Sequence, residues 1–187
     1  MRAGFLVFAA WLAGCATAPT PAPPAAPPPS TRPAGSSVVW LNVPLFPDRS
    51  NQCGPAAVAG VLRFWGKDVS MAALKQEIYR DSLKGSLSID LLLAAQAHGM
   101  SARLLEGGMA QVRKELDAGH PLVAFLNQGL RVLPVGHYVV LTGYDRGRGG
   151  VYVNSDVRKN AFMSDASFDR QWARGDRWAL AMQPAGR

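Results

Sequence analysis

Residues 52–66, QCGPAAVAGVLRFWG, place one cysteine directly before a run of small and apolar residues. The apolar positions recur at helical spacing, Pro55 suits a first helical turn, and Gly66 is a typical stop. We therefore predict a helix over 54–65 with Cys53 at its amino end. The unpaired N–H groups and the dipole at that end favour a thiolate over a thiol. A small buried cysteine that only fills a helix end is equally compatible with this position.

A second block, residues 136–145 with the sequence GHYVVLTGYD, opens a strongly β-prone run with a histidine. A histidine at the start of a central strand, preceded by glycine, can project into a cleft that a helix N-terminus also faces. There it can serve as general base for a cysteine nucleophile within hydrogen-bond reach. A lone histidine is more often a packed core residue, and we interpret His98 and His120 in that way. His137 and Cys53 are the candidate catalytic pair.

The remaining pattern predicts helices first and strands afterwards. Further helices are predicted over 70–80 (with Ser70 as a cap), 88–98 and 109–118. Strands are predicted over 38–43, 101–105, 121–126, 137–144, 151–154 and 178–182, with a hairpin turn at 147–150. This order indicates an α+β fold, with N-terminal helices packed on a C-terminal antiparallel sheet in one domain over 37–187.

The first residues, MRAGFLVFAAWLAGC, combine a basic start with an apolar run that is too short to span a bilayer. Their end, LAGC at 12–15, resembles a bacterial lipobox. The resemblance implies a lipoprotein signal peptide over 1–14 and a lipid on Cys15. It also implies anchoring in the bacterial cell envelope, in the outer membrane facing the periplasm; an ordinary secretory signal is the alternative. Residues 15–36 are rich in proline with little to bury, which predicts an extended tether.

Composition argues against several classes of function. The formal net charge is +7, but lysines and arginines are scattered without a basic block, so nucleic-acid binding is not expected. The histidines and cysteines lack metal-ligand spacing, and the sequence holds no glycine-rich phosphate loop, so we expect no metal and no cofactor. If lipid occupies Cys15, Cys53 is the only remaining thiol and cannot form an intramolecular disulfide.

The cysteine and histidine blocks, 84 residues apart from Cys53 to His137, resemble those of the papain-like cysteine peptidases of the double-glycine leader (bacteriocin-processing) type. Residues 86–105, SLSIDLLLAAQAHGMSARLL, look like that family's helix and short strand before the central sheet. The resemblance covers most of residues 38–183. It implies a papain-like fold in which Cys53 is the nucleophile and His137 the base, with an acyl-thioester intermediate.

The resemblance also implies a third residue that orients the imidazole, an aspartate in a V-x-V-x-Asp-Pro setting. The corresponding text here is VYVNSDV at 151–157, and the strict register puts Ser155 in the place of that aspartate. We favour Asp156 as the third member and keep Asn154 as the alternative. Each is also typical of a turn residue that ends a strand.

The family's oxyanion-hole donor is a glutamine several residues before the cysteine. In VPLFPDRSNQC, residues 43–53, Asp48 stands at that place and Gln52 adjoins the cysteine. An ionised aspartate cannot donate a hydrogen bond to a developing oxyanion and opposes its charge. We therefore expect Gln52 to take this role with the backbone N–H of Cys53, or the site to be weakened.

These observations favour a membrane-anchored, extracytoplasmic cysteine peptidase that cleaves peptide or protein substrates through Cys53, His137 and Asp156. The alternative is a catalytically weak or inactive peptide-binding or assembly lipoprotein on the same fold, which the replacement at Asp48 would favour. A third hypothesis is another thiol reaction on this scaffold, such as hydrolysis of cell-wall peptides or acyl transfer. The sequence alone sets neither the substrate nor the oligomeric state.

Overall fold

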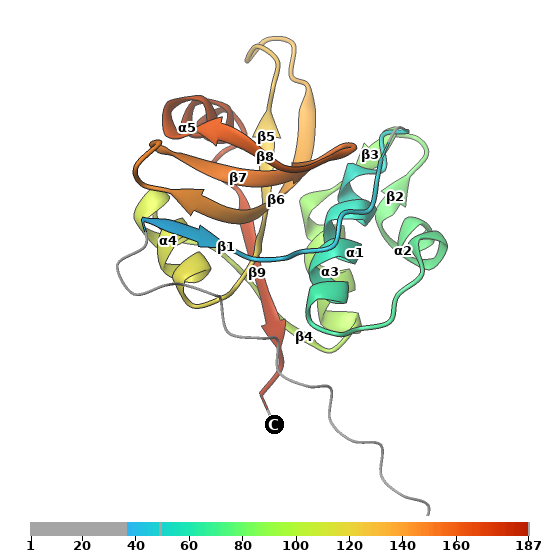
Figure 1. The fold of residues 1–187 in the computed structure, drawn as a ribbon. Helices are drawn as coiled ribbons and strands as arrows, with labels where there is room; N and C mark the ends of the chain where they lie inside the picture. Colours follow the sequence, from blue (N-terminus) through green and yellow to red (C-terminus); the bar gives the residue numbers. More distant parts are fainter. Residues whose placement is uncertain (1–36, 49, 187) are drawn as a thin grey trace, which may run out of the picture.

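A helical part that carries the cysteine packs beside a sheet that carries the histidine (Figure 1). The computed structural model describes residues 37–48 and 50–186, so the predicted signal peptide, the lipid on Cys15 and the tether lie outside the described residues. The helices are α1 (Cys53–Phe64), α2 (Met71–Ile78), α3 (Ser88–Ala97), α4 (Met109–Asp117) and α5 (Asp165–Arg174). The strands are β1 (Val38–Trp40), β2 (Tyr79–Arg80), β3 (Gly85–Ser86), β4 (Met100–Leu104), β5 (Leu122–Asn127), β6 (Gly136–Asp145), β7 (Gly150–Ser155), β8 (Arg158–Ser164) and β9 (Ala179–Pro184).

Strand β6 lies at the centre of a seven-stranded antiparallel sheet. Six strands follow the order β4-β9-β5-β6-β7-β8, and the seventh, β1, also pairs with β6. β5 pairs with residues 136–141 of β6, and β1 pairs with residues 143–145. Gly143 allows β1 to approach, because a Cβ there would lie 2.2 Å from the carbonyl oxygen of Val39. The pairing of β1 with β6 brings the segment that leads to Cys53 alongside the strand that carries His137.

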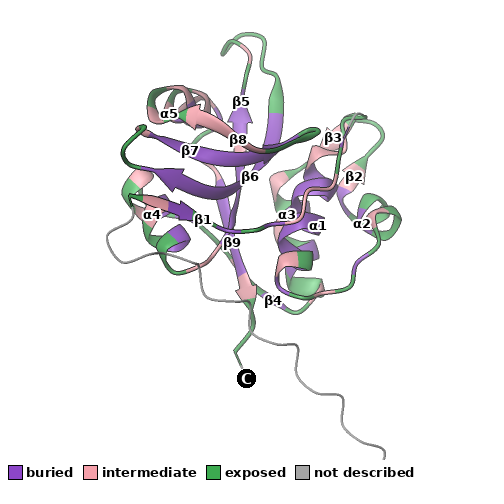
Figure 2. Ribbon diagram, in the orientation of Figure 1, coloured by how far each residue is buried: buried purple, intermediate pink, exposed green. Residues whose placement is uncertain are grey.

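Helix α1 is buried from Gly54 to Leu62, because it packs on β6 and is covered by α2 and α3 (Figure 2). A helix that is apolar on all sides is typical of a fully buried position. Val58 and Leu62 of α1 and Leu141 of β6 belong to one continuous core. This packing fixes the position of the first residue of α1, and therefore the position of the thiol.

The α+β fold with N-terminal helices and an antiparallel sheet is confirmed, with small shifts at the ends of the elements. The strand predicted over 38–43 ends at Trp40, although the Leu41 N–H still donates to the Thr142 carbonyl at 2.7 Å. Ser70 is the N-cap of α2 as expected, but its side chain makes no capping hydrogen bond. The expected turn at 147–150 joins β6 to β7.

Three features were not predicted: the β2–β3 hairpin, strand β8 and helix α5. β8 is an edge strand with no buried residue, so it lacks the alternation that marks a half-buried strand. For α5 a signal was present: Ser164 caps the helix by accepting from the Ser167 N–H, and Phe168 and Trp172 lie four residues apart and are buried. Within residues 37–48 and 50–186, no helix has both the length and the apolar character needed to cross a bilayer.

Candidate active site

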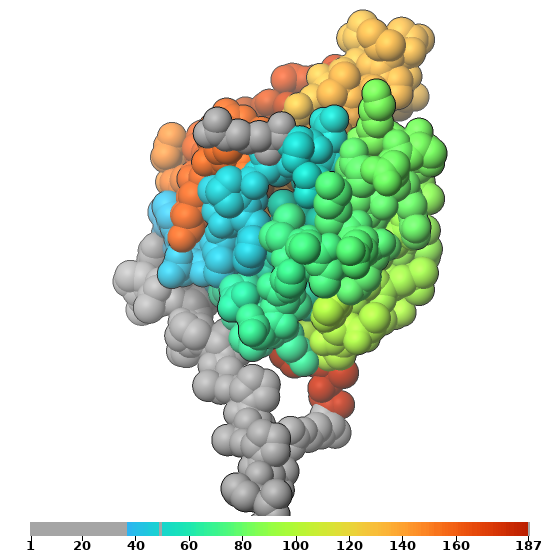
Figure 3. All heavy atoms as spheres, turned by 90° about the vertical axis from the view of Figure 1, so that its right-hand side faces the viewer, coloured from blue at the N-terminus to red at the C-terminus, as the bar shows by residue number. Residues whose placement is uncertain are grey.

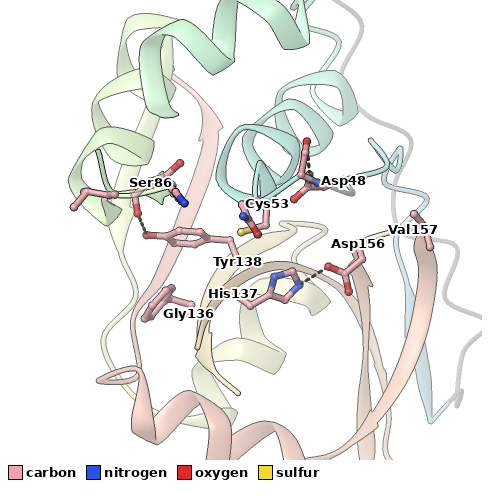
Figure 4. Close-up of a pocket in the computed structure, with 14 residues that line it drawn as sticks. Asp48, Cys53, Ser86, Gly136, His137, Tyr138, Asp156 and Val157 are labelled. Atoms are coloured by element: carbon pink, nitrogen blue, oxygen red, sulfur yellow. Dashed lines mark hydrogen bonds and ion pairs between the residues drawn. The ribbon is translucent and has the colours of Figure 1, made fainter. Parts of the chain in front are cut away.

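Cys53 and His137 line the same cleft, although 84 residues separate them. The cleft has a volume of about 700 Å³ and lies between the amino end of α1, the β2–β3 hairpin and the start of β6. Figure 4 shows the imidazole of His137 between Cys53 on one side and Asp156 on the other. The predicted pair is thus brought together on facing walls of one pocket.

Cys53 is the first residue of α1, follows the N-cap residue Gln52, and is partly buried. Burial raises the pKa of its thiol, and the negative charge of Asp48 acts in the same direction. The backbone N–H groups of Tyr138, Gly54 and Cys53 itself lower that pKa, as expected at a helix start, but they do not outweigh the burial. The helix end therefore does not produce a resting thiolate: the thiol is neutral at pH 7 in the free protein.

His137 is the second residue of β6, and the residue is buried, with 8% exposed. Burial lowers the pKa of its imidazole; the negative charges of Asp156 and Asp48 raise it, and the positive charge of Arg158 lowers it. The net direction is downward, so the ring is neutral at pH 7 and able to accept a proton. A neutral imidazole beside a neutral thiol is the protonation state from which a general base starts.

The nitrogen Nε2 of His137 contacts a serine and an aspartate that follow each other at the end of β7. It lies 2.9 Å from the Ser155 Oγ and 3.4 Å from the Asp156 Oδ1, and the Ser155 hydroxyl donates to the Asp156 Oδ2 at 3.2 Å. Asp156 has a left-handed φ of 53° in the β7–β8 turn, and its carbonyl accepts from the Asp48 N–H at 3.1 Å. Asp156 thus lies on the side of the ring away from Cys53, where the third residue of a triad is needed (Figure 4).

Asn154 is buried, and both ends of its amide are engaged outside this network. Its Nδ2 donates to the Val43 carbonyl at 3.1 Å, and its Oδ1 accepts from the Asn160 N–H at 2.9 Å. These bonds join β7 to the segment after β1 and to β8. The amide of Asn154 therefore has a structural role in this arrangement, and the imidazole contacts Ser155 and Asp156 instead.

Asp48, which stands at the place of the family's oxyanion-hole glutamine, lies in the cleft, whereas Gln52, the expected replacement donor, lies outside it. Asp48 is buried, lines the cleft, and accepts at Oδ1 from the Ser50 N–H at 2.8 Å. The Gln52 amide donates to the Ser50 Oγ at 2.5 Å, and Gln52 is not among the residues that line the cleft. In this conformation the backbone N–H groups that act on the sulfur are those of Tyr138 on β6 and of Gly54 and Cys53 at the start of α1.

Sequence reasoning did not identify Tyr138, which joins the two walls of the site. Its hydroxyl lies 2.9 Å from the Ser88 Oγ and donates to the Ser86 carbonyl at 3.3 Å, and burial raises its pKa to about 12. The sequence around this tyrosine predicts only a strand and gives no signal for the contact. Because the contact joins residues 50 positions apart, only the packing of β6 against the start of α3 reveals it.

The described part of the chain contains no group of three or more His, Cys, Asp or Glu side chains arranged to hold a metal ion. The polar side chains of the cleft are the thiol, the imidazole, two carboxylates, three hydroxyls, the Asn51 amide and the Lys84 amine. This set suits transfer of an acyl group through sulfur, with the imidazole carrying the proton.

Comparisons with solved structures give the same fold. A double-glycine motif protease from an AMS/PCAT transporter, solved with its leader peptide, is 22% identical with a TM-score of 0.63 over 78% of this chain and 94% of that chain. A putative C39-like peptidase from Bacillus anthracis is 20% identical, with a TM-score of 0.64 over 80% and 99%. The peptidase domain of Streptococcus ComA, a bifunctional ABC transporter of a quorum-sensing pathway, is 22% identical, with a TM-score of 0.61 over 75% and 98%.

At these identities the structural likeness establishes the fold alone. A search of curated proteins finds no match. The family model of the peptidase C39-like proteins matches residues 40–174, a range that includes Cys53, His137 and Asp156. Since this match spans most of the chain and includes both walls of the cleft, the chain belongs to the peptidase C39-like family.

Proposed function

We propose that the protein is a cysteine peptidase that hydrolyses peptide bonds, with Cys53 as nucleophile and His137 as general base. One observation carries the proposal: a thiol at a helix start and a buried neutral imidazole line one cleft of about 700 Å³. The imidazole is held on its far side by Ser155 and Asp156. A nucleophile, a base and a group that orients the base are the three parts that thiol catalysis requires.

The reaction starts when a substrate carbonyl lies against the Cys53 sulfur. His137 accepts the thiol proton at Nδ1, since Nε2 contacts Ser155, and the sulfur attacks the carbonyl carbon. The imidazolium then gives that proton to the leaving amine as the C–N bond breaks, which leaves an acyl-thioester on Cys53. Water, deprotonated by His137, hydrolyses the thioester and regenerates the thiol.

The developing oxyanion is stabilised by the backbone N–H groups at the start of α1, including that of Cys53. The Gln52 amide joins them only if it leaves the Ser50 Oγ, to which it donates in the free protein. The Asp48 carboxylate opposes the oxyanion from within the cleft. Because the loss of one donor costs about 3 to 4 kcal/mol, we expect a slow enzyme unless the substrate brings Gln52 into place.

The substrate is a peptide in extended conformation that enters beside the loop between β5 and β6. The solved protease of the AMS/PCAT transporter holds a leader peptide, which supports a peptide as the substrate class. Leu130, Val132 and Leu133 of this loop are exposed, as is Leu83 at the rim of the cleft. The loop and the β2–β3 hairpin lie on the same side of the molecule (Figure 3), so they offer apolar contacts to side chains that flank the scissile bond. We further propose that lipid on Cys15 anchors the enzyme in the cell envelope.

The test measures the alkylation of Cys53 by iodoacetamide from pH 4 to 10, together with cleavage of a fluorogenic peptide library. In the purified protein we expect cleavage that Cys53→Ala abolishes, and a pH profile of alkylation that changes when His137 is replaced by alanine. His98→Ala is the matched control, because His98 lies outside the cleft and pairs with Glu77. If the wild type and His137→Ala are alkylated alike and no peptide is cleaved, the peptidase proposal fails and the peptide-binding alternative remains.

A further inference from the structure

The buried hydroxyl of Ser155 lies between the imidazole and the carboxylate that was expected to orient it. The Ser155 Oγ is 2.9 Å from the His137 Nε2, whereas the nearest oxygen of Asp156 is 3.4 Å away, an ion-pair distance rather than a hydrogen bond. The Ser155 residue is 6% exposed, while the Asp156 side chain is 46% exposed. The shortest and best-shielded contact of the base is therefore to the serine.

We propose that Ser155 is a positioning residue that fixes the tautomer of His137, and that Asp156 acts on the imidazole mainly through the Ser155 hydroxyl. The proposal rests on the role of His137 as the base of the proposed peptidase. The geometry points to a chain of four groups, Cys53–His137–Ser155–Asp156, in place of a triad with a direct carboxylate–imidazole bond.

The direction of each hydrogen bond follows from proton counting. A carboxylate only accepts, so the Ser155 hydroxyl donates its single proton to Asp156 Oδ2. The serine oxygen can then only accept from His137, which requires the ring proton on Nε2. The lone pair of the neutral ring is consequently on Nδ1, the nitrogen left to receive the thiol proton. Neither Ser155 nor Asp156 changes its protonation state during the reaction.

The local backbone explains why the serine takes this place. The register between β7 and β8 shifts between Val153 and Ser155, and Asp156 follows with a φ of 53°. A residue in the left-handed region turns the chain away from the strand direction, so the carboxylate of Asp156 does not occupy the position that a strand residue would have. Ser155, the last residue of β7, stands there instead.

The series of four groups from Cys53 to Asp156 predicts an unusual pattern of mutant effects. When Asp156 is replaced by glycine, which tolerates the positive φ, the Ser155 hydroxyl loses its acceptor and turns to donate to Nε2. That hydrogen bond stabilises the Nδ1–H tautomer, which cannot accept the thiol proton, and a wrong tautomer costs catalytic triads on the order of 10⁴-fold in rate. Removing the serine as well deletes the misplaced donor. The double variant Ser155→Ala/Asp156→Gly should therefore be more active than Asp156→Gly alone.

The tautomer can be read directly, without any substrate, from the ¹⁵N chemical shifts of the histidine side chains in labelled full-length protein. His137→Gln identifies the His137 signals among the three histidines. We expect Nε2–H in the wild type and in Ser155→Thr, which keeps the hydroxyl, and Nδ1–H in Asp156→Gly. Ser155→Ala should lose the preference, with a fall of about 10- to 100-fold in the rate of Cys53 alkylation at pH 7, the range for one hydrogen bond to a charged group.

The alkylation rate is followed against pH because Asp48, Asp156, Arg158 and the Cys53 thiol all face the imidazole. An Nδ1–H tautomer in the wild type overturns the proposal. The proposal also fails if Ser155→Ala keeps the wild-type tautomer and the wild-type alkylation rate while Asp156→Gly is impaired, because Asp156 then acts on the imidazole directly. If Ser155→Ala does not fold, the tautomers of the other two variants still test the proposal, which requires Nε2–H in Ser155→Thr and Nδ1–H in Asp156→Gly. If the tautomers follow the proposal but no peptide is cleaved, the proposed peptidase activity fails and the positioning role stands.

Discussion

Replacing Asn154 with alanine removes one buried and one partly buried hydrogen bond, each of which is made to a backbone group. The amide donates to the Val43 carbonyl at 3.1 Å and accepts from the Asn160 N–H at 2.9 Å, and the residue is 4% exposed. Each group left unsatisfied costs about 1 to 3 kcal/mol, so Asn154→Ala should lower the free energy of unfolding by about 2 to 6 kcal/mol. The loss should appear as a lower urea midpoint with an unchanged slope, followed by tryptophan fluorescence.

The same variant separates a structural role from a catalytic one. If Asn154 serves only to join β7 to its neighbours, the Cys53 alkylation profile of the folded fraction keeps its dependence on His137. Asn154→Asp is the matched control, because it retains the acceptor for the Asn160 N–H, and its protonated carboxyl can still donate to the Val43 carbonyl. The protonated form should therefore shift the urea midpoint less than Asn154→Ala does. Wild-type stability in Asn154→Ala, combined with alkylation uncoupled from His137, would refute this reasoning and make Asn154 the orienting residue.

Three further outcomes are expected. Asp48→Asn removes a negative charge that raises the Cys53 pKa, so that pKa should fall and alkylation at pH 7 should become faster; an unchanged rate would contradict this. Gly143→Ala places a Cβ 2.2 Å from the Val39 carbonyl oxygen of β1 and should lower the free energy of unfolding by about 1 to 3 kcal/mol. Gly186→Ala is the control: it has open space around it and should leave the free energy of unfolding unchanged. Burial keeps the pKa of His137 below its value in the unfolded chain, so the unfolded state binds a proton at higher pH than the folded state does. Stability is therefore lost as the pH falls below about 6.5. His137→Gln should flatten this part of a plot of urea midpoint against pH.

The helix behind Cys53 and the strand behind His137 were both predictable, because each depends on residues close together in the chain. Apolar positions at helical spacing and Pro55 mark α1, and the β-branched run marks β6. β8 escaped prediction because an edge strand without a buried face has no periodic pattern to detect.

The behaviour of the thiol could not be predicted from its place at the helix start. The expected stabilising groups are present, since the backbone N–H groups of Gly54 and Cys53 lower the pKa. Their effect is smaller than that of burial, which depends on how β6 and the segment around Asp48 cover the sulfur. Burial of this kind comes from residues far away in the chain, and no local pattern records it.

The sequence by itself determined the candidate pair: a cysteine before a buried helix and a histidine that opens the central strand. Only the tertiary structure decided what stands around them, with Ser155 against the imidazole, Asp48 rather than Gln52 in the cleft, and Asn154 engaged elsewhere. The physical reason is that a helix or strand is specified by neighbours in the chain, whereas hydrogen-bond partners across a sheet depend on register. A shift of one residue, as between Val153 and Ser155, exchanges which side chain faces the site.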